Sequence, residues 1–271
     1  MDDRYTHGHH ESVLRSHRWR TAENSAAHLL PHLTPGLRLL DVGCGPGTLT
    51  LDLAARVAPG PVLGIDTSAE VLAAATELAA ERAGTGGEAL DVTFAVDDVY
   101  GLDLPDAAVD VVHVHQVLQH LSDPVAALTE LRRVVAPDGL VSVRESDFGA
   151  FVWAPADPRL DRWWELYHAV TRANGAEADA GRVLPSWFDA AGFGERTVTG
   201  STWTFATPDE REWWGGLWAD RTRSSAFAQQ AVEYGLATAD ELAELAAAFH
   251  RWAAADDGVF VVVHVEVLAR P

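Results

Sequence analysis

Two patterns of apolar and polar positions follow one another along this chain of 271 residues. Five short apolar runs have the length and composition of buried parallel strands, and they cover residues 37–42, 61–66, 92–96, 109–114 and 139–145. Stretches with helical periodicity separate these runs, so this part of the chain predicts an α/β sheet wound on both faces. The later part predicts helices over 157–174, 184–191 and 208–255 and strands over 195–205 and 258–268.

The loop after the first predicted strand is rich in glycine. Gly43, Gly45 and Gly47 alternate with other residues just after Asp41. Glycine has a free φ angle and no side chain, so a ligand can lie directly against this backbone. The G-x-G-x-G spacing departs from the G-x-G-x-x-G of nicotinamide-binding proteins. The second strand ends in Asp66, at the edge where open α/β sheets bind ligands, so this carboxylate is the candidate for binding a ribose diol.

With this loop the chain resembles the class I S-adenosylmethionine-dependent methyltransferases, in particular those of ubiquinone and menaquinone biosynthesis, over roughly residues 36–147. The dipeptide Asp123-Pro124 predicts a helix start, with a cap followed by a first-turn proline. Three further motifs match the family in order, namely Asp98-Val99 where the family meets adenine, residues 109–121 of the fourth strand and its exit loop, and residues 136–143 at the turn into the fifth strand.

The resemblance implies a Rossmann-like, doubly wound sheet of seven strands, mostly parallel with the last strand antiparallel, with an N-terminal lid and helical cap insertions. It also implies S-adenosyl-L-methionine as cofactor, S-adenosyl-L-homocysteine as product, and methyl transfer to an O, N or C atom of a small molecule. The expected divisions are a helical lid over 1–35, a cofactor-binding core over 36–147, a substrate-pocket cap over 148–257 and a final core strand within 258–271.

Cofactor contacts are expected from the lid, the glycine loop and the strand ends. Asp41 is expected to brace the loop and touch the methionine end, because a buried carboxylate needs partners. Cys44 is the single cysteine, which excludes a disulfide framework and a two-cysteine metal site. The predicted cofactor-binding residues are Tyr5, His10, Arg20, Asp41, Gly43, Cys44, Gly45, Gly47, Asp66, Thr67, Asp98, Val99, His115 and Gln116.

Four residues are candidates for catalysis. His115 ends the fourth strand at the ligand edge and is the preferred general base, because an imidazole with its ordinary pKa of about 6.5 accepts a proton at neutral pH. His120 is a second candidate and alternatively braces the next helix. Glu145 and Asp147 end the fifth strand at the same edge and are alternatively solvated or paired with Arg144.

Nine of the ten tryptophans follow residue 147, in the predicted cap. Each tryptophan alone is typical of core packing, but so many together favour a pocket for a bulky apolar or aromatic acceptor. The predicted substrate contacts are Trp153, Trp164, Trp214 and Trp218.

The composition narrows the possible partners and location. Forty acidic residues face 20 arginines and no lysine, for a net charge of −20. This charge disfavours nucleic acid and anionic membranes, and the absence of lysine excludes a Walker loop and a Schiff base. There is no long apolar run and no signal-peptide pattern, so we expect a cytoplasmic protein, and the arginine- and alanine-rich composition indicates a bacterial source. The sequence leaves open whether the protein forms a homodimer.

The N-terminal segment Tyr5–Glu11 carries three histidines and a glutamate that could bind a divalent metal. His9 and His10 are adjacent and would point in different directions, so we predict no metal there; a cofactor lid and a disordered terminus are the other interpretations. Three alternatives to methyl transfer also stay open. They are a cyclase or other non-methylating catalyst using the cofactor's positive charge, an NAD-linked oxidoreductase, and a cofactor-sensing protein without turnover.

Overall fold

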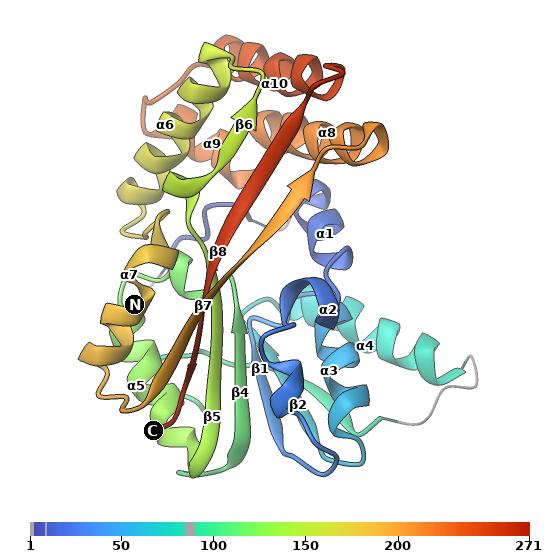
Figure 1. The fold of residues 1–271 in the computed structure, drawn as a ribbon, viewed down its shortest axis with the longest axis vertical. Coiled ribbons are helices and arrows are strands. Elements are labelled where there is room, and N and C mark those ends of the chain that lie inside the picture. The colour runs from blue at the N-terminus through green and yellow to red at the C-terminus, as the bar shows by residue number, and fades with distance from the viewer. Residues whose placement is uncertain (1–2, 9, 85–89) are drawn as a thin grey trace.

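The computed structural model describes residues 3–8, 10–84 and 90–271. Its strands form a twisted sheet with helices on both faces, and a group of helices lies beyond one end of the sheet (Figure 1). The strand order is β3-β2-β1-β4-β5-β8-β6, and β7 also pairs with β8. The strands are β1 (Leu39–Val42), β2 (Val62–Asp66), β3 (Val92–Val96), β4 (Val109–His115), β5 (Val135–Ser146), β6 (Val152–Ala154), β7 (Arg196–Phe205) and β8 (Val259–Ala269).

The pairing confirms the predicted doubly wound architecture. β1 to β5 pair in parallel, and β8 runs antiparallel to β5, β6 and β7. All seven predicted strands are present, but the sheet of the described residues has eight. The addition is β6, which pairs Val152 with Val261 and Ala154 with Val259. A strand of three residues is too short to produce a periodic signal in the sequence.

Two apolar layers hold the helices to the sheet. On one face α2 (Ala22–Ser25) and α3 (Thr48–Val57) join a cluster with β1 and β2. On the other face α5 (Pro124–Val134) and α7 (Ala180–Ala190) pack on β4, β5 and β8. The Asp123 side chain accepts a hydrogen bond from the Ala126 amide at 2.9 Å, which confirms the predicted start of α5. The remaining core elements are α4 (Ala69–Gly84), η1 (Leu30–His32), η2 (Leu118–His120) and η3 (Phe148–Ala150).

We call the group of helices beyond the sheet the cap. It consists of α6 (Pro158–Ala173), α8 (Pro208–Ser224), α9 (Ala226–Glu233) and α10 (Ala239–Ala253), and β8 extends into it (Figure 1). The predicted helical stretch 208–255 is divided into three helices, because Ser225 ends α8 in an extended conformation and Gly235 adopts a φ of +67° after α9. Among the described residues, no helix combines the length and apolar character that crossing a bilayer requires.

Residues 3–8 and α1 (Glu11–Arg18) lie between the sheet and the cap, with α1 beside α8 (Figure 1). We call them the N-terminal segment. Asp3 accepts hydrogen bonds from the Tyr100 hydroxyl at 2.6 Å and the Ser122 amide at 3.0 Å, on the core side. The Gln230 side chain of α9 donates to the Tyr5 carbonyl at 3.2 Å. The segment therefore spans from core to cap.

Candidate active site

The glycine loop joins β1 to α3 at the carboxyl edge of the sheet. Gly43, Gly45 and Gly47 have φ angles of +66°, +55° and +77°, in the left-handed region that residues with a side chain rarely adopt. The Gly45 amide donates to Asp66 Oδ2 at 3.1 Å, which ties the loop to the end of β2. The predicted strand, turn and helix are confirmed, and the loop backbone is held open beside the sheet edge.

Asp41 supports the glycine loop from below. Its Oδ1 lies 2.7 Å from His113 Nδ1 on β4, and its Oδ2 accepts a hydrogen bond from the Thr50 hydroxyl on α3 at 2.6 Å. The Asp41 side chain is buried, so both contacts are sheltered from water. These contacts join the two strands and the helix that meet at the loop, in agreement with the bracing role predicted for Asp41.

A cavity of about 560 Å³ lies between the glycine loop, the ends of β2, β3 and β4, the N-terminal segment and α8. This size is typical of small-molecule sites, which are roughly 300–1,000 Å³. Asp41 and Cys44 line a smaller hollow behind the loop. The predicted site residues that line the main cavity are Tyr5, Arg20, Gly43, Gly45, Asp66, Thr67, Asp98, Val99, His115, Gln116 and His120.

Two predicted cofactor contacts lie elsewhere. The His10 side chain caps α1 and accepts a hydrogen bond from the Ser12 amide at 3.2 Å. Gly47 begins α3 and packs so closely on Ala75 and Phe94 that an added Cβ would lie 2.9 Å from Ala75 Cβ. Neither His10 nor Gly47 lines the cavity. Both residues stabilise the local backbone. The spacing of the loop residues in the sequence does not distinguish this role from contact with a ligand.

One end of the cavity is acidic. Asp66 Oδ1 accepts a hydrogen bond from the Ser68 amide at 3.0 Å, and Asp98 Oδ1 accepts one from the Tyr100 amide at 3.0 Å. Asp97 also lines this end. The backbone contacts hold Asp66 at the end of β2 and Asp98 just after β3, where both line the same cavity as the glycine loop.

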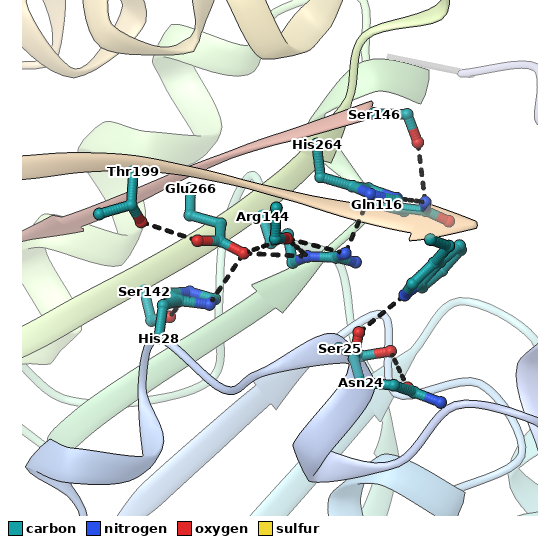
Figure 2. A network of polar contacts seen from close by, with 12 residues as sticks. Asn24, Ser25, His28, Gln116, Ser142, Arg144, Ser146, Thr199, His264 and Glu266 are labelled. Atoms are coloured by element: carbon teal, nitrogen blue, oxygen red, sulfur yellow. Dashed lines mark hydrogen bonds and ion pairs between the residues drawn. The ribbon is translucent and has the colours of Figure 1, made fainter. Parts of the chain in front are cut away.

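Gln116 lies where β4 leaves the sheet, with a φ of +55° that is unusual outside glycine. Its Oε1 accepts a hydrogen bond from Arg20 Nη2 at 2.5 Å, and its Nε2 donates to the Ser146 hydroxyl at 2.7 Å. Figure 2 shows the Gln116 amide beside His264 of β8, with 2.9 Å between Gln116 Nε2 and His264 Nε2. Gln116, at the exit of β4, thus joins Arg20 to β5 and β8.

Arg144 extends this network to Glu266 of β8 (Figure 2). Its Nη2 lies 2.9 Å from His264 Nδ1, and its Nε lies 3.3 Å from Glu266 Oε1. His28 Nδ1 lies 3.6 Å from the same Glu266 oxygen. Burial lowers the pKa of Arg144 to about 9 and that of His28 to about 4. Arg144 therefore pairs with Glu266, and the alternative pairing with Glu145 or Asp147 is wrong.

His115 lies on the cavity at the end of β4, as predicted. Its side chain is 5% exposed, and neither ring nitrogen has a hydrogen-bond partner among the described residues. Burial, together with the nearby cations Arg20 and Arg144, lowers the pKa of His115 well below its ordinary value. The imidazole is therefore neutral at neutral pH, and the expectation of an ordinary pKa is corrected by this environment.

His120 lies on the cavity within an aromatic cluster. Its ring is edge-on to Tyr5 at 4.7 Å and to His7 at 5.4 Å between centroids. His120 Nε2 lies 3.0 Å from Gln119 Nε2. Burial, together with the Arg20 and Arg221 cations, lowers the pKa of His120 to about 3. This residue therefore contacts the N-terminal segment and the cavity together.

Glu145 and Asp147 are structural rather than catalytic in this geometry. The buried Glu145 carboxylate accepts hydrogen bonds from the Val117 and Leu118 amides at 2.9 and 2.8 Å, and burial raises its pKa to about 8. Asp147 binds Arg182 of α7, with 2.9 Å between Asp147 Oδ2 and Arg182 Nε. Neither carboxylate lines the cavity. Both predictions fail because the partners of these side chains are distant in the sequence.

The tryptophans predicted to contact substrate are not on the cavity. Trp214 and Trp218 are buried in the cap, where Trp214 stacks on Phe205 at 4.2 Å. Trp164 donates its indole N–H to the Phe148 carbonyl at 2.7 Å, and Trp153 stacks on Phe260 at 5.9 Å. These rings pack with other apolar side chains of the cap, such as Leu160, Leu217 and Phe249, and form the core of the cap itself.

Several cavity residues were not among the predicted site residues. His7, Asp97 and Arg221 line the cavity, and Arg221 is more than 200 positions away from the N-terminal segment it contacts. His9 lies outside the described residues. Within residues 3–8, 10–84 and 90–271, no group of three or more His, Cys, Asp or Glu side chains is arranged to hold a metal ion.

The fold and the cavity together define an α/β protein with a cavity of small-molecule size beside a glycine loop. A family model for a methyltransferase domain matches residues 40–143. An uncharacterized methyltransferase of Schizosaccharomyces pombe is 35% identical over 226 residues, which cover 82% of this chain and 80% of that protein. The probable methyltransferase ltbC of Aspergillus luteorubrus is 32% identical over 286 residues, covering 98% and 96%.

Among solved structures, phosphoethanolamine N-methyltransferase 2 of Haemonchus contortus, in complex with phosphomonomethylethanolamine and S-adenosylhomocysteine, shares the fold. Its TM-score is 0.58 at 18% identity, with 97% of this chain and 58% of that chain covered. The chain belongs to the class I S-adenosylmethionine-dependent methyltransferases, and its cofactor is S-adenosylmethionine. The structure fits this cofactor, since the glycine backbone faces the cavity and the buried Nε of Arg20 has no partner among the described residues.

Proposed function

We propose that this methyltransferase transfers a methyl group to an O, N or C atom of a small-molecule acceptor that occupies the cap end of the main cavity. The observation that carries the proposal is the shared cavity of about 560 Å³, because the same space is lined by the glycine loop and by residues of the N-terminal segment and α8. A cofactor on the loop and an acceptor under the cap would therefore meet within it.

In this proposal the acidic end holds the nucleoside. Asp66 accepts the ribose hydroxyls, since each of its oxygens accepts one backbone hydrogen bond from the described residues and carboxylate oxygens have further acceptor capacity. Asp98 and Val99 border the adenine. The glycine loop allows close approach, because no Cβ stands between its backbone and the cavity.

Arg20 holds the methionine carboxylate. Its guanidinium lies at the glycine loop, lining both the main cavity and the smaller hollow. Gln116 fixes one end of the guanidinium at 2.5 Å, and the Nε at the other end has no partner among the described residues. Burial lowers the pKa of Arg20 to about 10, so the guanidinium remains charged at neutral pH.

The chain then has to align the acceptor and exclude water. S-adenosylmethionine supplies a methyl group that is already electrophilic, because it is attached to a sulfonium. Alignment of two reactants can lower a barrier by about 7–11 kcal/mol. We propose that the N-terminal segment acts as the lid, because two of its residues, Tyr5 and His7, line the cavity.

His115 is the candidate for accepting a proton from the acceptor. Both of its ring nitrogens are available, and the neutral ring is the form that accepts a proton. Its lowered pKa makes it a weaker base than an ordinary histidine. In this proposal the nucleophilic atom of the acceptor gives its proton to His115 while that atom bonds to the methyl group, and not before.

The test is incubation of the purified protein with S-adenosylmethionine and a panel of hydroxylated, amino and acidic aromatic compounds, followed by mass spectrometry. The expected result is S-adenosylhomocysteine together with an acceptor in which one hydrogen is replaced by methyl. A product with unchanged mass would identify a cyclase or isomerase instead. Stabilisation of the protein by NADH but not by S-adenosylhomocysteine would overturn the proposed cofactor site.

A further inference from the structure

Arg221 is a buried cation on the cavity with no carboxylate partner among the described residues. Its side chain belongs to α8 and is 4% exposed. Nη2 donates to the Ser12 carbonyl at 3.3 Å and to the Ser16 hydroxyl at 3.1 Å, and the guanidinium lies 4.5 Å from the ring centroid of Trp218. Its Nε has no hydrogen-bond partner among the described residues. A buried charge without a counter-ion is costly, so its presence on a cavity points to a ligand.

The groups around Arg221 can also donate to an anion. His7 and His120 line the same part of the cavity, and the Nδ1 atom of each is buried without a partner in the described chain. Burial, with a smaller contribution from the Arg221 cation, lowers the pKa of both histidines, so their rings are neutral and each carries a single ring proton. Burial lowers the pKa of Arg221 only to about 10, which leaves the guanidinium charged.

The two ends of the cavity differ in charge. Asp66, Asp97 and Asp98 gather at the nucleoside end, and Asp3 of the N-terminal segment binds Tyr100 on the core side, whereas Arg221 lies where α8 meets α1. Arg221 is not among the residues of the hollow at the glycine loop, where Arg20 lies. One arginine is therefore placed for the cofactor's carboxylate, and the other faces the space left for the acceptor.

We infer that Arg221, with His7 and His120, forms a subsite for a carboxylate on the acceptor. This inference rests on the proposed function, because it assigns the cap end of the cavity to the acceptor. A guanidinium fits a carboxylate with two parallel hydrogen bonds, and the neutral imidazoles add donors without adding charge. The substrate class is thus an organic acid, in which the carboxylate anchors the molecule and another atom or the carboxylate itself faces the methyl group.

The experiment compares three probes on the protein saturated with S-adenosylhomocysteine, by titration calorimetry. The probes are benzoate, its neutral analogue benzamide, and inorganic phosphate. We expect benzoate to bind about tenfold or more tightly than benzamide, since hydrogen bonds to charged groups contribute about 1.5–3 kcal/mol. Equal binding of benzoate and benzamide would overturn the inference, and a preference for phosphate would replace the carboxylate by a phosphate group.

Variants locate the subsite. Arg221→Gln should abolish the preference for benzoate while changing S-adenosylhomocysteine affinity by less than about threefold. Arg221→Lys keeps the charge but lacks the two parallel N–H donors of the guanidinium, so it should retain part of the preference for benzoate. Arg211→Gln is the matched control, because Arg211 is a buried arginine of the same helix that binds the Ala253 carbonyl and does not line the cavity. Loss of the preference in the control as well would assign it to α8 stability and overturn the subsite.

The outcomes also separate this inference from the proposed function. A wild-type protein that does not bind S-adenosylhomocysteine would overturn the proposed function. A protein that binds S-adenosylhomocysteine but does not distinguish acid from amide would leave the proposed function intact and overturn the subsite alone. The wild-type measurement needs no variant, so the inference stays testable if Arg221→Gln does not fold.

Discussion

Gly43 offers a test of how tightly the glycine loop is built against the end of β4. Its φ is +66°, and a Cβ at this position would lie 2.4 Å from Cγ2 of Val117. Carbon atoms in contact are ordinarily about 3.5–4.0 Å apart, so the Gly43→Ala variant must move either the loop or Val117. We expect two costs, about 1–2 kcal/mol for an L residue in the left-handed region and about 1–3 kcal/mol for overpacking.

The summed loss of about 2–5 kcal/mol is large beside a typical unfolding free energy of about 5–15 kcal/mol. Gly235→Ala is the matched control for the backbone cost alone, because Gly235 has a φ of +67° and no atom within 4 Å of the added Cβ. Urea unfolding of both variants measures the two losses. We expect Gly43→Ala to lose about 1–3 kcal/mol more than the control.

A double-mutant cycle with Val117→Ala isolates the collision. Shortening Val117 removes the Cγ2 atom, so the Gly43→Ala change should cost less in the Val117→Ala background, by about the overpacking cost. If Gly43→Ala costs no more than Gly235→Ala, or if Val117→Ala gives no relief, the close approach of loop and β4 exit is not a determinant of stability. In that case the reasoning from the Gly43 environment is refuted.

Asp66→Ala should weaken S-adenosylhomocysteine binding about 10- to 100-fold per lost hydrogen bond, and unchanged affinity by calorimetry would remove the ribose assignment. His115→Ala should lower turnover about 10²–10⁴-fold while cofactor affinity stays within a few fold. Burial and nearby arginines hold the His115 pKa below its ordinary value, so wild-type turnover should show no rise from this group between pH 7 and 9. A rise in that range that is lost in the variant would contradict the low pKa. Folded His120 has its pKa lowered to about 3, so the unfolded chain binds one more proton below about pH 6.5. The contribution of His120 to the free energy of unfolding is therefore fully present above that pH, and on acidification it falls by about 1.4 kcal/mol per pH unit. Urea unfolding between pH 5 and 6 should show this slope in the wild type and not in His120→Asn.

The sequence by itself determined seven of the eight strands in the described part of the chain, and the residues of the proposed cofactor end of the site. The glycine loop, Asp66 and Asp98 belong to local patterns in which a strand, its exit and the next helix follow within a few residues. In a parallel sheet the carboxyl ends of neighbouring strands meet at one edge, so local positions already place these side chains together. The same logic placed His115 and Gln116 correctly, because both lie at the exit of β4.

The tertiary structure alone decided the roles that depend on distant partners. Glu145 and Asp147 end a strand at the ligand edge, yet the Val117 and Leu118 amides and the Arg182 side chain occupy their carboxylates. No spacing rule in one sequence reports such pairs, because hydrogen bonding is satisfied in three dimensions. The lowered pKa of His115 likewise results from burial and from charges brought near by folding.

The cap shows the same division most clearly. Its tryptophans were visible in the sequence, but composition does not tell whether a ring faces a cavity or a core, and packing placed them in the core. Arg221 had no signal at all, since only the packing of α8 against α1 brings its guanidinium to the cavity beside His7. The residues proposed to bind the cofactor were therefore encoded locally, whereas the proposed acceptor end depends on contacts between segments about 200 residues apart.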